Sequence, residues 1–506
     1  MKNRLIFTIL GPLVGVLLIL FFDFNTDRPE TTRMAAVAAW MAIWWMTEVV
    51  PLAVTALLPI SLFPLLGIMN GKLVSSAYCN YIIFLFIGGI LVALAMERWN
   101  LHRRIALRIL LFVGIQPSRI ILGFMLATAF LSMWISNTAT TMMMVPIGLA
   151  VVNSLEQQIG EKQISKYSVG LFLGIAYGAS IGGVATLVGT PTNLSFSRIF
   201  QINFPQAPEI TFASWLMFAL PVSATVLVCS WWWLTHLFCR YLETVQLNPS
   251  LFQNQYRQLG PMSWAEKVVL ADFIVLVLLW LFRSDIRLGS FTLYGWSNLF
   301  DQPYKLNDGT VAITLAIILF LIPASLSEKA ENERILDWKT ATKIPWNIVL
   351  LLGSGFAVAS GFKSSGLSEW LGGRLSEVVG CHPVILLVVT CLLVTFLTEL
   401  TSNVTTVEIL LPILGALAIA IKIHPLFLMV PATISCSFAF MLPVATPPNA
   451  IVFSTNRIQT SEMAKVGILM NLLCVFLVTI ATLVIGKIIF DMDLGQPPSW
   501  IFQKEL

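Results

Sequence analysis

Long apolar runs follow one another through almost the whole of this chain. Of its 506 residues, 57% are hydrophobic and only 11% are charged, and the mean hydropathy is +0.84. A helix needs roughly 20 apolar residues to cross about 30 Å of hydrocarbon, and inside lipid its backbone must satisfy its own hydrogen bonds. These runs therefore predict an all-α polytopic membrane protein and exclude a soluble domain.

Eleven segments have the length and composition of transmembrane helices. Two further apolar regions, 117–152 and 383–421, are too long for one span, and a Ser-Asn pair interrupts each near its middle. We expect re-entrant hairpins there. Prolines inside the segments 168–201 and 427–455 predict two broken helices. The predicted spans are 5–22, 34–50, 53–69, 79–97, 168–201, 212–238, 266–282, 310–323, 346–362, 427–455 and 463–489.

The distribution of Lys and Arg predicts the orientation. With the N-terminus in the cytoplasm, 18 of the 30 positive residues fall on the cytoplasmic side, as the positive-inside rule requires. The odd number of spans then places the C-terminus outside. The net charge of +4 is small and dispersed, which does not indicate a nucleic-acid partner. The predicted parts are an N-terminal helix and loop (1–33), a first repeat (34–238), a cytoplasmic loop (239–265), a second repeat (266–490) and a C-terminal tail (491–506).

Two motifs recur in the same order in the two halves of the chain. The stretch WISNTATTMMMVP at 134–146 precedes GTPTN at 189–193, and LTSNVTTVEILLP at 400–412 precedes ATPPN at 445–449. Because an odd number of spans separates the copies, the two halves must have opposite orientations in the membrane. Such inverted repeats are typical of secondary transporters, whose sites lie near the midplane where broken helices meet.

The residue types in these motifs indicate what the site binds. Pro191 and the pair Pro447 and Pro448 remove backbone donors, and an unwound backbone is tolerated in a membrane only where it lines a cavity. Freed carbonyls and Ser, Thr and Asn side chains offer neutral oxygens to a hard cation. N–H groups at the half-helix N-termini can hold a carboxylate. The pattern predicts that Na⁺ and a carboxylate share one polar pocket without charged side chains.

The SNT and SNV tips, paired with the GTPTN and ATPPN breaks, resemble the divalent anion/Na⁺ symporter family of di- and tricarboxylate carriers over roughly residues 4–490. The resemblance implies a homodimer, in a plasma or bacterial inner membrane, that imports substrates such as succinate, malate, fumarate or citrate with two or more Na⁺. It implies one Na⁺ site at Ser132, Ser136, Asn137 and the backbone of Gly189, and another at Thr398, Thr401, Asn403 and the backbone of Ala445. The implied substrate positions are Ser136, Asn137, Thr138, Thr190, Pro191, Ser402, Asn403, Val404, Thr446 and Pro447.

Two positions depart from the family pattern. Val404 replaces the Thr expected at the end of the second tip, so one hydroxyl contact to the substrate is missing. Thr192 stands where the second break has Pro448, which predicts a less rigid first break. The first departure bears on the identity of the substrate more than on sodium coupling.

The site must travel intact if the carrier alternates between the two sides of the membrane. We therefore expect an elevator-type movement in which about 117–201 and 383–455 form the mobile part and the other spans the scaffold. Two amphipathic segments, 102–114 and 327–343, should lie on the membrane surface as connecting arms. In the second, Ile335, Leu336 and Trp338 are expected on the apolar face.

Several alternatives remain open from the sequence. Glu48, Glu399 and Glu408 lie at membrane depth, where each can tune cation affinity, carry a proton, form a structural pair or stay a neutral acid. A membrane enzyme would need acidic or His clusters in a long loop, which the chain lacks in 239–265 and 283–309. A sodium-independent dicarboxylate exchanger, or a carrier of sulfate or another divalent anion, fits the same fold.

Overall fold

The computed structural model describes residues 2–239, 250–288, 291–325, 333–378, 380, 382–493 and 497–501. This part of the chain is helical apart from one short antiparallel ribbon, in which β1 (Ile286–Leu288) pairs with β2 (Phe291–Leu293). Seven of the described helices are long and apolar enough to cross a membrane, and six shorter apolar helices accompany them. The architecture is that expected of a polytopic membrane protein.

Each predicted single span coincides with helix within a few residues, except 53–69. That segment divides into α3 and α4 at Ala56 and Leu57, because Pro59 begins a new helix. The helices of these spans, with the short α5, are α1 (Lys2–Phe21), α2 (Pro29–Thr47), α3 (Leu52–Thr55), α4 (Leu58–Leu65), α5 (Gly71–Ala77), α6 (Tyr81–Arg98), α12 (Phe212–Phe238), α14 (Trp264–Leu281), α15 (Asp308–Leu321), α17 (Trp346–Ser364) and α23 (Thr460–Phe490).

A helical hairpin stands at each predicted hairpin position, and a helix pair with an unwound middle at each predicted break. The hairpins turn at the two Ser-Asn pairs, and the chain unwinds at 185–190 and again at 438–446. The hairpins are α8 (Pro117–Ser132) with α9 (Asn137–Ile159), and α19 (Pro383–Thr398) with α20 (Asn403–Ala420). The broken helices are α10 (Glu161–Val184) with α11 (Pro191–Asn203), and α21 (Leu426–Ser437) with α22 (Pro447–Phe453).

A helix spans the first of the two predicted arms, but not the whole described part of the second. The first arm forms α7 (Leu101–Val113), which packs along α8. The second, 327–343, has in its described part only the four-residue α16 (Trp338–Ala341), and 327–332 lie outside the described residues. Asp337 accepts a hydrogen bond from the Thr340 backbone N–H at 2.7 Å and caps this helix, and Pro345 follows closely.

The side chains of this second segment also differ from the prediction. Ile335 and Leu336 are fully buried, whereas Trp338 is 74% exposed, so the three do not share one apolar face. The helix that corresponds to α7 in the order of elements is α18 (Leu367–Val378), which packs against α20. The sequence analysis missed it because LSEWLGGRLSEV combines two glycines with three charged residues.

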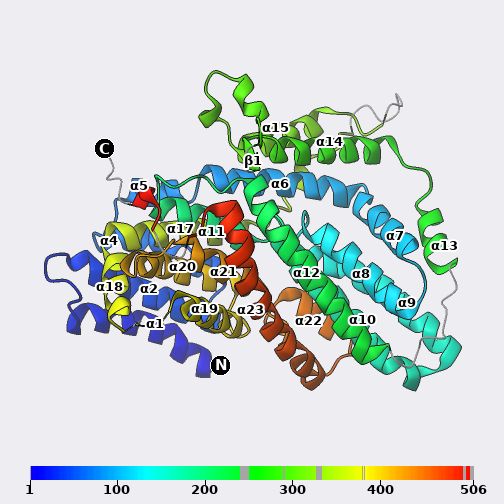
Figure 1. Cartoon of the computed structure of the whole chain (residues 1–506), viewed down its shortest axis with the longest axis horizontal. Coiled ribbons are helices and arrows are strands. Elements are labelled where there is room, and N and C mark those ends of the chain that lie inside the picture. Colours follow the sequence, from blue (N-terminus) through cyan, green and yellow to red (C-terminus); the bar gives the residue numbers. More distant parts are fainter. Residues whose placement is uncertain are drawn as a thin grey trace.

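The helices pack as two groups that meet along α11, α17 and α20. Figure 1 shows α10, α12 and α23 side by side. Of these, α12 contacts α8 and α10, and α23 contacts α19 and α21. On another side, α6 lies with α14 and α15, and α1 pairs with α2. The remaining described helices are α13 (Ser250–Gln258), η1 (Trp296–Leu299), η2 (Pro303–Lys305) and η4 (Ser499–Ile501).

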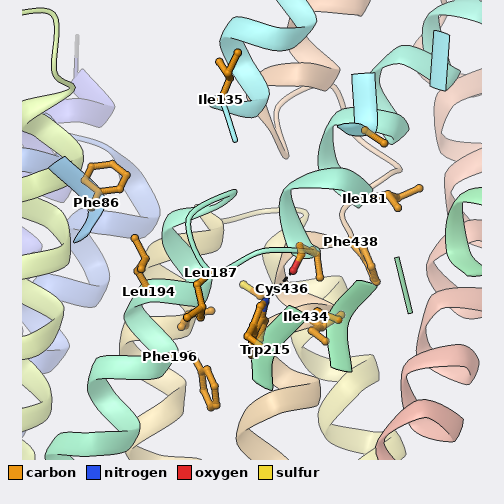
Figure 2. Packing of buried hydrophobic residues seen from close by; sticks show 14 of the residues in the cluster. Phe86, Ile135, Ile181, Leu187, Leu194, Phe196, Trp215, Ile434, Cys436 and Phe438 are labelled. Carbon is orange, nitrogen blue, oxygen red and sulfur yellow. Dashed lines mark hydrogen bonds between the residues drawn. The ribbon is translucent and has the colours of Figure 1, made fainter. Parts of the chain in front are cut away.

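One buried apolar cluster runs through both halves of the chain. Leu187 and Leu194, from the first break, belong to the same cluster as Ile434 and Cys436, from the second (Figure 2). Close packing of this kind leaves few voids and fixes side chains in preferred rotamers. The polar groups of the two breaks are therefore embedded in a well-packed interior.

Candidate functional site

The first hairpin tip brings two acceptor oxygens within hydrogen-bonding distance of one hydroxyl. Ser132, the last residue of α8, places its Oγ 2.5 Å from Oδ1 of Asn137 and 2.7 Å from the carbonyl oxygen of Ala179 on α10. A hydroxyl has one proton, so it can donate to only one of these two acceptors at a time. The three oxygens therefore form an electron-rich cluster suited to a hard cation such as Na⁺.

The second hairpin tip repeats this arrangement. Thr398 Oγ1 lies 2.7 Å from Oδ1 of Asn403 and 2.9 Å from the carbonyl oxygen of Cys436 on α21. Thr398 stands 266 residues after Ser132, and Asn403 stands 266 residues after Asn137. The predicted Na⁺ residues Ser132, Asn137, Thr398 and Asn403 thus form two equivalent clusters. Ala179 and Cys436 contribute carbonyls that the sequence analysis did not name.

The other predicted Na⁺ positions lie close by, with different contacts. Gly189 packs on Gly183 so closely that a Cβ atom at 189 would lie 2.4 Å from the Gly183 carbonyl oxygen, and Asn137 lies on the other side of Gly183. Thr401 is less symmetric, because its Oγ1 donates to the Leu397 carbonyl at 2.9 Å and lies 2.6 Å from Oγ1 of Thr406. Ala445 is in the second unwound segment, with its N–H bonded to the Leu442 carbonyl at 3.2 Å.

Four helices begin at the predicted substrate residues. Ser136, Thr190, Ser402 and Thr446 are the N-cap residues of α9, α11, α20 and α22. Thr190 and Thr446 have nearly the same backbone conformation, with φ −142° and ψ 142° against φ −141° and ψ 149°. Pro191 and Pro447 then open their helices. Helix N-termini carry partial positive charge, so these four can attract a dianion without a basic side chain. Free N–H groups come from α9, α11 and α20, because α22 begins with two prolines and the Asn449 N–H is bonded to Thr446 Oγ1.

Two asparagines hold the unwound segments in shape. Asn193 Nδ2 donates to the carbonyls of Thr186 at 2.7 Å and Val184 at 3.2 Å, and Asn449 Nδ2 donates to those of Ala439 and Leu442, both at 3.0 Å. Both side chains are fully buried. The sequence analysis gave them no role, although each is the last residue of a duplicated motif, and that repetition was the signal that could have identified them.

Each hairpin tip also accepts hydrogen bonds from the neighbouring unwound segment, through a backbone carbonyl in the first half and a side chain in the second. Thr186 Oγ1 donates to the Met133 carbonyl at 2.5 Å. At the position equivalent to Met133, the carboxylate of Glu399 accepts the backbone N–H groups of Met441 and Leu442 at 2.9 and 3.0 Å, and the Asn471 side chain at 2.7 Å. Of the roles left open for Glu399, the geometry favours the structural one. Glu48 is an exposed residue that ends α2 in a left-handed conformation, with φ 45°.

Contacts between the two halves hold the four site segments together. Thr192 Oγ1 lies 3.1 Å from Ser437 Oγ, and Tyr177 OH donates to the Phe440 carbonyl at 3.1 Å. In addition, α9 packs against α22, and α11 packs against α20. Thr192, which departs from the family pattern, thus makes a contact between the breaks. Ser136 is exposed, whereas Asn137, Thr138 and Ser402–Val404 are half-buried and accessible from outside the packed interior.

A cavity of about 580 Å³ ends beside the first hairpin tip. Ile135 and Ala139, which flank the Ser136–Thr138 motif, line it together with Lys343. His102, on the α7 arm, also lines it, and burial lowers the pKa of this imidazole below its usual value. His102 is therefore neutral near pH 7, and the Lys343 ammonium contributes positive charge to the cavity.

Known proteins share both this sequence and this fold. A family model described as the sodium:sulfate symporter transmembrane region matches residues 7–492. The chain belongs to the divalent anion/Na⁺ symporter family. Sodium-dependent dicarboxylate transporters named SdcS, from Staphylococcus saprophyticus and Staphylococcus aureus, are 40% and 41% identical to it over 500 residues, covering 98% of this chain and 94% of each relative.

Solved structures of more distant transporters share the fold alone. The MtrF protein of Neisseria gonorrhoeae, described as representing a class of antimetabolite efflux pumps, has a TM-score of 0.53 at 12% identity, with 80% of each chain covered. The YdaH transporter of Alcanivorax borkumensis has a TM-score of 0.53 at 14% identity, covering 83% of this chain and 87% of its own. Together, the family model and the curated relatives show that this chain is a multi-pass membrane transporter, and the membrane-enzyme alternative is wrong.

Proposed function

We propose that this protein is a sodium-coupled symporter that imports dicarboxylates. The observation that carries the proposal is the pair of equivalent oxygen clusters, Ser132 with Asn137 and Thr398 with Asn403, next to four helix N-termini. Each cluster offers neutral oxygens to one Na⁺, and the N-termini offer N–H groups to the substrate carboxylates. The names of the relatives, sodium-dependent dicarboxylate transporters, agree with this assignment.

The neutral site couples the ions to the substrate by charge. Two Na⁺ ions supply two positive charges, which balance one dianion inside a low-dielectric interior where an unbalanced charge is costly. Movement with Na⁺ alone, or with the dianion alone, would carry net charge through that interior. This physical reason favours symport over the sodium-independent exchanger, because the exchanger has no use for two cation sites.

The substrate proposal is narrower than the sequence prediction. Succinate, malate and fumarate are compact dianions with a carboxylate at each end, which matches N-termini contributed by the two halves. Val404 is half-buried and leaves the second tip with one hydroxyl fewer than the first. A third carboxylate of citrate would have fewer partners there, so we expect dicarboxylates to bind more tightly than citrate. Sulfate and citrate remain the competitors to test.

The transport movement is proposed to be of the elevator type. The body that carries the site comprises α8–α11 and α19–α22, and we add α12 and α23 because they pack on α10, α19 and α21. The scaffold is then α1–α6, α14, α15 and α17, and the arms are α7 and α18. We further propose a homodimer through the scaffold, an N-terminus in the cytoplasm, a C-terminus outside, and a plasma or bacterial inner membrane location.

Purified protein in liposomes tests the proposal. Labelled succinate should accumulate when a Na⁺ gradient points inward, and should not when choline replaces Na⁺. Asn137→Ala and Asn403→Ala should each abolish uptake while the protein still elutes as a single species, because each amide belongs to both an oxygen cluster and a helix N-terminus. Equal uptake in choline would favour the exchanger, and wild-type uptake by either variant would exclude the site.

A further inference from the structure

Two equivalent positions in the hairpins have opposite environments. Met142 in α9 and Glu408 in α20 each stand six residues after the Ser of their tip. Met142 is 59% exposed and lines the cavity of about 580 Å³, whereas Glu408 is fully buried. The rise of 1.5 Å per residue places each side chain roughly 9 Å along its helix from the tip. The structure is therefore open beside the first hairpin and closed beside the second.

The surroundings of Glu408 pack closely on its carboxyl group and give a hydrogen-bond partner to only one of its oxygens. Gly355 of α17 presses on the carboxyl group so closely that a Cβ atom at 355 would lie 2.3 Å from Cδ of Glu408. Ser195 Oγ of α11 donates to Oε1 at 3.2 Å, and Oε2 has no hydrogen-bond partner. Of the described titratable groups, the Tyr78 phenol is the one that interacts with this carboxyl, and no basic group offsets its charge. An ionised carboxylate without a counter-charge is too costly to bury, so this environment accepts the acid with its proton.

Inverted repeats exchange environments when a carrier changes the side to which it opens. In the opposite state the second hairpin should border the cavity and the first should be closed. Glu408 would then be exposed and Met142 buried. A carboxyl exposed to water ionises above about pH 4.3, so Glu408 has to gain a proton each time it returns to its place against Gly355.

We propose that Glu408 is a proton-binding site that must be occupied before the carrier can adopt the state seen here. In the orientation predicted from the distribution of Lys and Arg, the state seen here opens to the cytoplasm. In the opposite state Glu408 is exposed to the outside of the cell. The proton is taken from the outside when the carboxyl becomes buried and is returned to the outside when it is exposed again. No net proton crosses the membrane. The inference rests on the alternating movement proposed above and adds external pH as a control of it.

The sign of the effect follows from proton linkage. The buried state binds one proton more than the exposed state, so raising the pH favours the exposed state, by up to tenfold in the ratio of states for each pH unit. Between pH 7 and 9 succinate is already a dianion and both Na⁺ sites are neutral. Comparison with a variant that has a neutral side chain at position 408 therefore isolates the contribution of Glu408 in this interval.

The first test measures the state directly and needs no transport. A cysteine in place of Met142 reacts with a maleimide in the state seen here and is protected in the other. Its labelling rate is measured in purified protein from pH 7 to 9, with and without the additional change Glu408→Gln, and with the parent chain as background. Dividing the labelling rate of the chain with Glu408 by that of the Glu408→Gln chain removes the effect of pH on the thiol itself. The ratio should fall as the pH rises, and a constant ratio would overturn the proposal.

The second test measures uptake into liposomes at a fixed internal pH of 7. Wild-type succinate uptake should decrease between external pH 7 and 9, whereas the Glu408→Gln variant should show a flat profile. Glu408→Met, with the residue found at the equivalent position 142, is a second neutral variant if the first is poorly folded. The same slope in wild type and a folded neutral variant would overturn the proposal. Loss of Na⁺-driven uptake in the wild type would instead count against the proposed function.

A matched variant checks the role of the repeat. Met142→Glu introduces a carboxyl at the equivalent position of the first hairpin, which is exposed in the state seen here. Combined with Glu408→Gln, it should make uptake depend on internal rather than external pH. Dependence on external pH in this double variant would contradict the exchange of environments on which the inference depends.

Discussion

The hydroxyl of Ser132 lies 2.5 Å from the amide oxygen of Asn137, and both belong to a cluster completed by a backbone carbonyl. Thr398 and Asn403 repeat the contact at 2.7 Å. Polar groups at a hairpin tip usually pair donors with acceptors, but each of these clusters has more acceptors than protons. A bound cation would relieve that imbalance, and this gives the two clusters a common function.

Removing either hydroxyl should weaken sodium binding. We expect Ser132→Ala and Thr398→Ala each to raise the Na⁺ concentration for half-maximal uptake by roughly tenfold. Each change removes one oxygen ligand, which contributes about 1–3 kcal/mol to the binding of Na⁺. The measurement is succinate uptake against Na⁺ concentration. Thr479→Ala on α23 is the control, since that buried hydroxyl donates to the Val475 carbonyl of its own helix and belongs to neither oxygen cluster. An unchanged Na⁺ dependence in both site variants would refute the cluster assignment.

The asparagines of the breaks should be needed for the shape of the site. In Asn193→Asp and Asn449→Asp the side-chain size is kept, but the N–H₂ donor is replaced by an acceptor that faces backbone carbonyls. We expect each variant to lose transport and about 1–3 kcal/mol of stability, because buried carbonyls lose their partners. Thermal unfolding in detergent and uptake in liposomes measure the two effects. Retained stability and uptake would show that the breaks hold their shape without these side chains.

A crosslink across the boundary between the two groups of helices should stop transport. Tyr81 of α6 donates a hydrogen bond to Gln201 of α11, and Arg457 pairs with Glu156 within the proposed mobile part. Cysteines at Tyr81 and Gln201, joined by a short bismaleimide, should trap one state and abolish uptake. The same reagent on cysteines at Glu156 and Arg457 should leave uptake unchanged. Full uptake by a completely crosslinked Tyr81–Gln201 pair would rule out the elevator movement.

The α7 arm is anchored by a buried ion pair whose loss should destabilise the protein. Arg104 Nε donates to Glu266 at 2.8 Å, and the two residues are 4% and 5% exposed. Arg104→Met alone leaves the carboxylate of Glu266 buried without its counter-charge, so we expect a loss of about 3–5 kcal/mol. Arg104→Met with Glu266→Met should lose less. Melting temperatures in detergent measure both, and equal losses would argue against a charge-pairing role.

Some of this structure follows from local sequence. The hairpins and breaks are where they were predicted, because prolines and Ser-Asn pairs inside apolar runs interrupt a helix whatever surrounds them. The candidate site residues in the two duplicated motifs came from the resemblance of those motifs to the family, and their roles stay a prediction. The error at 327–343 shows the limit, since an apolar and charged pattern does not tell whether Ile335 and Leu336 face lipid or, as here, the protein interior.

The part of the structure that the sequence did not predict depended on contacts between segments far apart in the chain. Asn471 meets Glu399, Ser195 meets Glu408 and Tyr177 meets Phe440 across 72, 213 and 263 residues, and no local pattern predicts such pairs. Glu399 and Glu408 were equivalent candidates in the sequence. Tertiary packing made one a bonded support for an unwound segment and left the other against Gly355 with an oxygen unpaired. By itself the sequence determined where helices break and which polar atoms are available. Only the tertiary structure decided which of those atoms meet, because that depends on how the helices pack.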